Sequence, residues 1–429
     1  MSVGRAAIVT GLASAVVAVL GLGREMLVSR LFGASPAMDA FVLAVTVVTM
    51  GASILGISLR TSLVPVLVGG LGRTERDRVF VASLLGAAAA GALLWVASMA
   101  ALPWVLRAML PEISPALANA LGQWLSPLWC TGLLAGALQG ALQADRQFLG
   151  AGLIPGAVPA ACMLALGVPL AQGEQADTIA LLAGGTLAGA TLEVLAAGWL
   201  LRRRGWRLRP AARHSDVCTT ALRRVAQQSW AMLPGMSAAA SSQIIDRAMA
   251  SALGPGAVSV LNYGGKLPSL ALTLGGMAVA TAIFPYYAEH LGKNDTAAAQ
   301  ALLRCWARRL LWGGAAAAAV GMAVSLPVAR LVFQGGALTA EDAVVVAQVQ
   351  ACALLQLPFC WASWAFSRYL AASGRNGELS LITLGNVVVN VAGNYVCMRW
   401  LGVSGIALAT AFMFLYALLA CRHAVLRRR

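Results

Sequence analysis

Residues 19–41 read VLGLGREMLVSRLFGASPAMDAF, and this stretch ends one apolar segment, makes a short turn and begins the next. It contains an arginine, a glycine and an acid at intervals of nine and six residues, namely Arg24, Gly33 and Asp39. A second stretch, DRAMASALGPGAVSVLNYGGKL at 246–267, has the same layout. There the two intervals recur at Arg247, Gly256 and Asn262. The chain therefore contains an internal repeat.

The repeat divides the chain into two halves, residues 1–212 and 213–429, with about six apolar segments in each. An even number of membrane helices in each half makes the repeats parallel, related by an axis along the membrane normal. Halves of this kind typically rock against each other around a binding site at their interface. We therefore predict two parallel six-helix lobes.

The composition predicts a membrane protein. Of the 429 residues, 59% are hydrophobic and 11% are charged, and the mean hydropathy is +0.78; soluble domains are about 45–50% apolar and about 25% charged. A membrane-spanning helix needs about 20 apolar residues. We therefore expect an all-α polytopic protein with about twelve spans, at residues 5–31, 38–69, 79–107, 117–143, 149–171, 177–201, 226–253, 257–287, 303–333, 340–370, 377–398 and 403–422.

The basic residues indicate the topology. The net charge is +15, and the arginines gather in alternate loops, with the densest group in the 202–225 loop. The positive-inside rule places that loop and both termini in the cytoplasm of a bacterial inner membrane. This placement favours contact with anionic membrane lipids over nucleic acid binding.

No motif for enzyme chemistry is visible. The 8 cysteines form no C-x-x-C pair, and the 3 histidines fall in loops or tails, so no metal site is predicted. The sequence has neither G-x-x-x-x-G-K-[ST] nor G-x-S-x-G. We therefore expect a protein that is not an enzyme and has no cofactor other than a coupling sodium ion or proton.

Charged and polar side chains inside spans are the candidate functional residues, because burying them in a membrane is costly. Lys266 lies nine residues into the 257–287 segment, with Asn262 one turn earlier, and its ammonium could meet a phosphate. The neighbouring residues Asp246 and Arg247 face different directions and do not simply neutralise each other, so Asp246 could hold a cation or a proton. Glu193 is either a protonatable site or a neutral buried acid.

Two further groups have alternative interpretations. Arg24 either contacts an anionic substrate, anchors its helix at the membrane interface or pairs locally with Glu25. Asp39 either complements a helix dipole or forms a gate with Arg24. Residues Asn386, Asn390 and Asn394 recur every four positions on one helix face. They either coordinate a cation, with sodium the candidate at Asp246, Asn386 and Asn390, or form hydrogen bonds between helices.

Residues 19–41 and 246–267 resemble two signatures of the MurJ/MviN lipid II flippases, a family of the multidrug/oligosaccharidyl-lipid/polysaccharide exporter superfamily. Residues 331–343 and 401–411 are similar to later segments of that family. The resemblance implies alternating access of two lobes around a cationic cavity that receives the diphosphate and sugar of a polyprenyl-linked precursor. By position, Arg24, Asp39 and Lys266 match the family's substrate residues, and Asp246 with Asn386 and Asn390 resembles a sodium site.

The chain also departs from the family pattern. Ala18, Ala52 and Ser53 stand where the family has basic residues, Lys266 replaces an arginine, and Asn390 replaces an acid found in some members. The predicted spans number two fewer than the family usually has. Because of these departures, a related exopolysaccharide or O-antigen unit is an alternative to lipid II as the cargo.

The combined expectation is a flippase that moves a polyprenyl-diphosphate-linked saccharide from the cytoplasmic to the periplasmic leaflet. Arg24, Asp39, Lys266, Asn262 and Arg247 would bind the substrate. Membrane lipids and cell-envelope glycan synthases are the expected partners. The alternatives are a cation-coupled multidrug exporter of the same superfamily, a membrane-embedded glycan polymerase or ligase, and a non-transporting scaffold.

Overall fold

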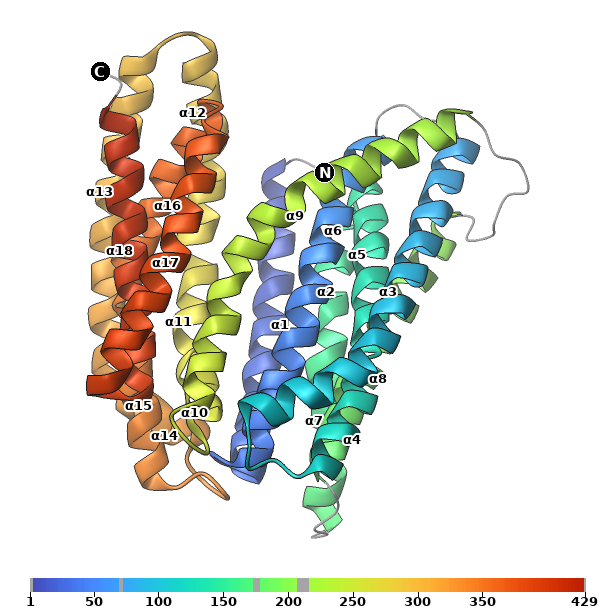
Figure 1. The fold of residues 1–429 in the computed structure, drawn as a ribbon. Helices are drawn as coiled ribbons and strands as arrows, with labels where there is room; N and C mark the ends of the chain where they lie inside the picture. The colour runs from blue at the N-terminus through green and yellow to red at the C-terminus, as the bar shows by residue number, and fades with distance from the viewer. Residues whose placement is uncertain (1–2, 69–71, 173–177, 207–215, 428–429) are drawn as a thin grey trace. The chain divides into compact units, whose positions relative to one another are not determined.

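The computed structural model describes residues 3–68, 72–172, 178–206 and 216–427, which form helices joined by short turns (Figure 1). The chain divides into two compact units. The N-terminal unit comprises Met1–Val28 and Pro36–Ser237, and the C-terminal unit comprises Ser29–Ser35 and Ala238–Arg429. The all-α membrane fold is therefore confirmed. The lobe boundary predicted between residues 212 and 213 lies outside the described residues.

The N-terminal unit is built from eight helices, one 3-10 turn and the first part of α9. In chain order they are α1 (Val3–Phe32), α2 (Pro36–Val68), α3 (Arg73–Met109), α4 (Pro115–Leu125), α5 (Leu128–Ala144), α6 (Phe148–Leu153), the 3-10 turn Ile154–Gly156, α7 (Ala157–Gln172), α8 (Thr178–Arg203) and α9 (Asp216–Ser251). Prolines mark two of the breaks, since Pro127 precedes α5 and Pro155 lies in the 3-10 turn.

The C-terminal unit holds the rest of α9 and the later helices. They are α10 (Ala257–Gly264), α11 (Lys266–Ala271), the π-helical turn Leu272–Met277, α12 (Ala278–Gly292), α13 (Thr296–Ala323), α14 (Ser325–Phe333), α15 (Ala340–Leu354), α16 (Gln356–Ala372), α17 (Asn376–Leu401) and α18 (Val403–Leu426). The axis of α14 is bent by 58° from that of α13. A capping box between Thr339 and Asp342 begins α15.

Among the described residues, nine helices are long and apolar enough to cross a membrane, or ten if the bent pair α13–α14 is one span. The predicted count of twelve is therefore not confirmed. The two predicted spans that are not among these helices are 226–253 and 257–287. Helix α9 is long but interrupted by polar residues, and the 257–292 stretch is divided into pieces that are each shorter than a span.

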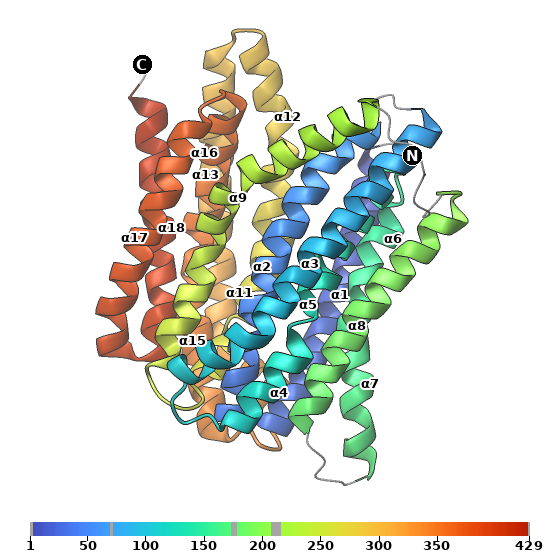
Figure 2. The ribbon, with the colours of Figure 1, turned by 45° about the vertical axis from the view of Figure 1, so that its right-hand side comes forward.

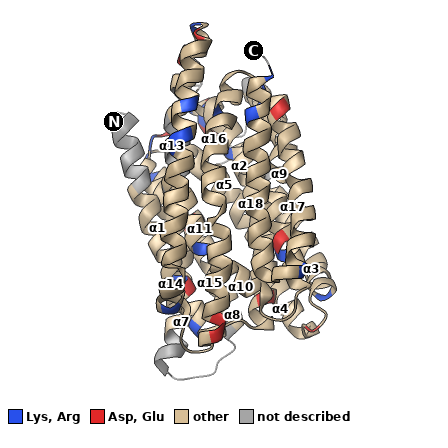
Figure 3. Cartoon of the chain, turned by 90° about the vertical axis from the view of Figure 1, so that its left-hand side faces the viewer, with Lys and Arg blue, Asp and Glu red and all other residues tan. Residues whose placement is uncertain are grey.

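Small residues set the distance between helices within each unit. A Cβ atom added to Gly136 on α5 would lie 2.5 Å from the Gly56 Cα on α2. In the other unit α17 and α18 lie side by side (Figure 2), where Gly405 faces the carbonyl group of Cys397. Helices in membranes associate through such close backbone approach, because lipid supplies no hydrophobic force between them. Figure 3 shows that most of the helix surface carries no charge.

The turn between α1 and α2 is held inside the C-terminal unit by three hydrogen bonds. The Ala337 amide donates to the Arg30 carbonyl oxygen at 2.7 Å, and the Ser29 hydroxyl to the Phe333 carbonyl oxygen at 3.3 Å. The Tyr263 hydroxyl donates to the Gly33 carbonyl oxygen at 3.1 Å. Residues from the start of the chain thus complete the C-terminal unit.

Candidate functional site

A polar cavity of about 480 Å³ lies within the C-terminal unit. Its walls come from α9, α10, α11, α15, α17 and α18, with Gln356 at the start of α16. Five residues that the sequence singled out lie around it, namely Asp246, Arg247, Asn262, Lys266 and Asn386. The structure therefore brings together two cations, one acid and two amides that come from four separate helices.

Asp246 is held by the asparagine stripe of α17. The Nδ2 atoms of Asn390 and Asn394 donate to Asp246 Oδ1 at 2.8 and 2.7 Å. Both asparagine side chains are completely buried, one turn apart on the same helix face. The interhelical hydrogen bonds that were one interpretation of this stripe are therefore present.

The amide oxygens of this stripe are relevant to the other interpretation, which is cation coordination. Among the described residues, the Oδ1 atoms of Asn386, Asn390 and Asn394 are buried and have no hydrogen-bond partner. A buried acceptor without a donor is costly, so a group that supplies positive charge fits this position. Carboxylate and amide oxygens suit a hard cation. A sodium ion would be held by these amide oxygens and the Asp246 carboxylate, whose Oδ1 atom accepts from the amide nitrogens of Asn390 and Asn394 in this structure.

Lys266 lies at a break between two short helices rather than in the interior of one long helix. Helix α10 ends at Gly264, Gly265 joins the two elements, and Lys266 is the first residue of α11. A π-helical turn follows at Leu272–Met277, and such turns are frequent at functional sites. The predicted continuous helix over 257–287 is wrong in this respect. Asn262 and Lys266 nevertheless both line the cavity.

Sequence reasoning missed several uncharged members of this cavity. They are hydroxyl and amide side chains at Ser242, Gln243, Ser269, Gln356, Thr383 and Thr410. A glutamine inside an apolar run, such as Gln356, is the signal that could have found them, because an intramembrane polar group needs a partner. These groups give the cavity the hydrogen-bonding capacity that a sugar or a phosphate requires.

Arg24 and Asp39 belong to the N-terminal unit. The guanidinium group of Arg24 contacts the Glu25 carboxylate at 2.5 Å, so the local pair that the sequence allowed is present. Glu25 is buried, and so is Asp39 in the first turn of α2, where an acid complements the helix dipole. The roles predicted for Arg24 and Asp39 in substrate binding stay predictions.

Glu193 lies in a polar chain across three helices of the N-terminal unit. Gln139 Nε2 on α5 donates to Glu193 Oε1 on α8 at 2.8 Å, and Arg60 Nη1 on α2 donates to Gln139 Oε1 at 3.1 Å. One glutamine thus bridges an intramembrane acid and an intramembrane base. Arg60 lies inside the predicted 38–69 span, and its charge was the overlooked signal.

Ala52 has a packing reason to be small. Its side chain is 3% exposed, and a Cβ added to Gly132 on α5 would lie 2.8 Å from the Ala52 Cβ. A long basic side chain would not fit in this contact between α2 and α5. Ala52, where the family has a basic residue, therefore lies at a point where α2 and α5 pack closely.

The fold is shared with solved structures of a flippase and of multidrug transporters. A solved structure titled lipid II flippase MurJ, inward closed conformation, matches with a TM-score of 0.83 at 18% identity, covering 97% of this chain and 87% of that one. An outward-facing MATE-family multidrug transporter matches with a TM-score of 0.68 at 16% identity, covering 98% and 94% of the two chains. A MOP superfamily transporter from Pyrococcus furiosus gives a TM-score of 0.68 at 16% identity, covering 99% and 94%.

The sequence defines the family within that class. The family model described as lipid II flippase MurJ matches residues 28–428. The chain belongs to the MurJ lipid II flippase family. Two proteins described as probable lipid II flippase MurJ, from two Helicobacter pylori strains, are each 30% identical over 188 residues. That region is 43% of this chain, and it spans less than half of those relatives, 40% of their length.

Proposed function

We propose that this protein is a flippase that moves a polyprenyl-diphosphate-linked saccharide, with lipid II as the first candidate, from the cytoplasmic to the periplasmic leaflet. One observation carries the proposal beyond family membership: the cavity of the C-terminal unit combines Arg247 and Lys266 with many neutral hydrogen-bonding groups. The cations suit a diphosphate, and the hydroxyl and amide groups suit a sugar.

In the N-terminal unit, Arg24 contacts the anionic substrate during transport and Asp39 is its partner in a gate. A sodium ion at Asp246, Asn386 and Asn390, or a proton, drives the cycle. The orphaned amide oxygens beside Asp246 support the sodium alternative. Glu193 is the corresponding candidate for a proton.

The protein works in the bacterial inner membrane with both termini in the cytoplasm, which the distribution of arginines supports. Glycan synthases of the cell envelope supply or consume its cargo.

The experiment is depletion of the protein in its own host, followed by mass spectrometry of the accumulated polyprenyl-linked lipids. Accumulation of lipid II with lysis supports the peptidoglycan role. Accumulation of another linked oligosaccharide, with growth intact, assigns an exopolysaccharide or O-antigen unit instead. Unchanged lipids together with increased drug sensitivity would replace the flippase by a multidrug exporter.

A variant pair links this phenotype to the cavity. Complementation with Lys266→Gln should leave the lipid accumulated, whereas Lys293→Gln should restore normal lipid levels. Lys293 is the matched control because it is exposed and pairs with Glu289 away from the cavity. Equal complementation by both variants at equal protein levels would remove Lys266 from the site.

A further inference from the structure

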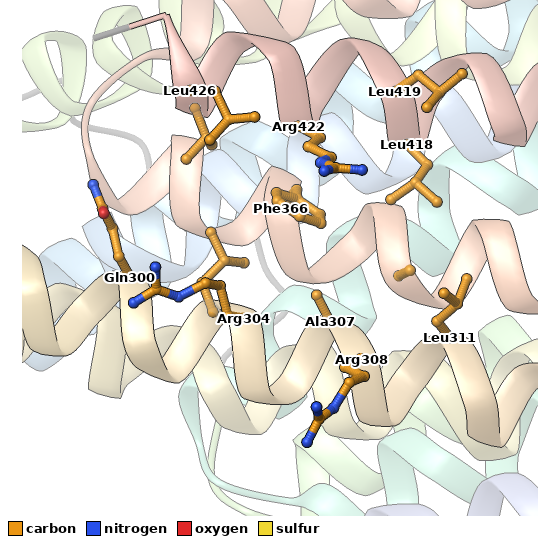
Figure 4. Close-up of a pocket in the computed structure, with 13 residues that line it drawn as sticks. Gln300, Arg304, Ala307, Arg308, Leu311, Phe366, Leu418, Leu419, Arg422 and Leu426 are labelled. Carbon is orange, nitrogen blue, oxygen red and sulfur yellow. The ribbon is translucent and has the colours of Figure 1, made fainter. Parts of the chain in front are cut away.

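A second concave surface of the C-terminal unit is a groove of about 470 Å³ between α13, α16 and α18. Figure 4 shows Phe366 between the residues of α13 and those of α18. The groove shares no lining residue with the cavity that holds Lys266. It is therefore a site separate from that cavity.

The lining of this groove is mostly aliphatic. Leu303 and Val425 are buried in its wall, while Leu419 and Leu426 are 53% and 46% exposed. All three helices belong to segments that are apolar enough to cross a membrane. Apolar side chains exposed on such helices face the acyl chains of the bilayer. A hydrocarbon chain is the occupant that this part of the groove suits.

Three arginines line the same groove, and the guanidinium group of Arg308 points away from Phe366 (Figure 4). Arg304 and Arg308 extend from α13 and Arg422 from α18 (Figure 4). All three arginines are exposed, and the thirteen lining residues, which are all described, include no acid. Within the described residues none of the three forms an ion pair. A ligand with a negatively charged group would therefore complement the charge of this groove.

We propose that the groove binds an anionic phospholipid, with its phosphate between Arg304 and Arg422 and one acyl chain along Leu311, Phe366 and Leu418. Arginine forks bind phosphate in a bidentate manner. Basic pockets between membrane helices bind anionic headgroups where the helix ends meet the interface. Arg422 lies one turn before the end of α18, which places it at that interface.

The test is native mass spectrometry of the purified full-length protein titrated with phosphatidylglycerol or with phosphatidylcholine of the same acyl chains. We expect tighter binding of phosphatidylglycerol. Each arginine near an anionic lipid contributes about fivefold in affinity, so the double variant Arg304→Gln, Arg422→Gln should bind it about 30-fold more weakly. The single variants should each lose about fivefold.

Arg309→Gln is the matched control, because Arg309 is the exposed neighbour of Arg308 on α13 and lies over the Trp306 ring, outside the groove. It should bind phosphatidylglycerol like the native protein. Thermal unfolding of each variant, with unchanged midpoints expected for these exposed arginines, verifies that the fold is intact.

Three results would overturn the proposal. Equal affinity for the two lipids would show that the arginines recognise no charge. Displacement of the lipid by inorganic phosphate would show a free-anion site without an acyl chain. Displacement by a polyprenyl diphosphate at lower concentration than phosphatidylglycerol would make the groove a substrate site.

Discussion

The hydroxyl group of Tyr263 donates a hydrogen bond to the carbonyl oxygen of Gly33 at 3.1 Å, although 230 residues separate them in the sequence. Tyr263 is completely buried, and its ring packs beside that of Phe333 with the centroids 5.5 Å apart. Gly33 has a positive φ of 56°, which turns the chain between α1 and α2. The stretches 19–41 and 246–267 that carry the internal repeat thus meet in one contact of the C-terminal unit.

The first prediction concerns this hydrogen bond. Tyr263→Phe leaves a buried carbonyl oxygen without its donor, which costs about 1–3 kcal/mol. The thermal midpoint in detergent should fall. Tyr395→Phe is the control, because Tyr395 is 52% exposed on α17 and its hydroxyl accepts from Arg399, an exposed donor that water can satisfy in the variant. The midpoint of this variant should not change. Equal midpoints for the two variants would show that the hydrogen bond contributes nothing.

The second prediction concerns Gly336, which has a φ of 60° and whose added Cβ would meet the carbonyl group of Arg30. Gly336→Ala should destabilise the protein by more than about 1 kcal/mol, because a strained backbone and a steric clash act together. Gly374 has a φ of 73° with open space around its added Cβ. Gly374→Ala should therefore show the backbone strain alone, and a larger loss there than at Gly336 would contradict the clash.

The internal repeat and the apolar segments were sufficient to predict an all-α membrane bundle. They identified the α1–α2 turn and the α9–α10 turn because both combine glycine with a change from one apolar run to the next. The asparagine periodicity also identified the face of α17 that meets Asp246. Local patterns of this kind determine which residues share a helix face.

Other features depend on tertiary packing, which local sequence patterns do not specify. The break at Gly265 and the π-helical turn after it divide an apolar run that looks continuous. The bridge from Arg60 through Gln139 to Glu193 joins three helices that no local spacing relates. The fit of Ala52 against Gly132 likewise depends on how closely α2 and α5 pack.

The third prediction concerns the charge at Lys266. A charge-assisted hydrogen bond to phosphate contributes about 1.5–3 kcal/mol, so Lys266→Gln should slow flipping about 10- to 100-fold. Lys266→Arg keeps the charge and adds a bidentate fork, so its rate should equal or exceed the native rate. The measurement is the flipping of a labelled polyprenyl-diphosphate lipid in proteoliposomes. A lysine-to-arginine variant as slow as the glutamine variant would argue against a phosphate contact.

The fourth prediction concerns cation coupling at Asp246. Asp246→Asn preserves an oxygen that accepts from Asn390 and Asn394 but removes the negative charge. We expect the variant to fold normally and to lose the dependence of transport on the cation. Transport is measured in proteoliposomes with and without a sodium gradient, at constant pH. If the sodium dependence of the variant matched that of the native protein, the coupling site would lie elsewhere.

The fifth prediction separates packing from chemistry at Glu193. Glu193→Leu leaves the Gln139 amide without its acceptor, which costs about 1–3 kcal/mol of stability. Glu193→Gln retains an acceptor oxygen and should unfold near the native temperature. If Glu193 carries a proton during transport, the glutamine variant should nevertheless lose the dependence of its rate on a pH gradient. A glutamine variant with native pH-gradient dependence would leave Glu193 with a structural role alone.

The placement of residues 29–35 in the C-terminal unit has a consequence for dissecting the molecule. A fragment that begins at residue 238 would lack this turn, so the Ala337 amide and the Tyr263 hydroxyl would lose the acceptors described above. A fragment that ends at residue 237 would carry the turn without its partners. Two co-expressed fragments should therefore reassemble when the turn at residues 29–35 binds the C-terminal fragment. A split reporter divided between residues 237 and 238 would detect this binding.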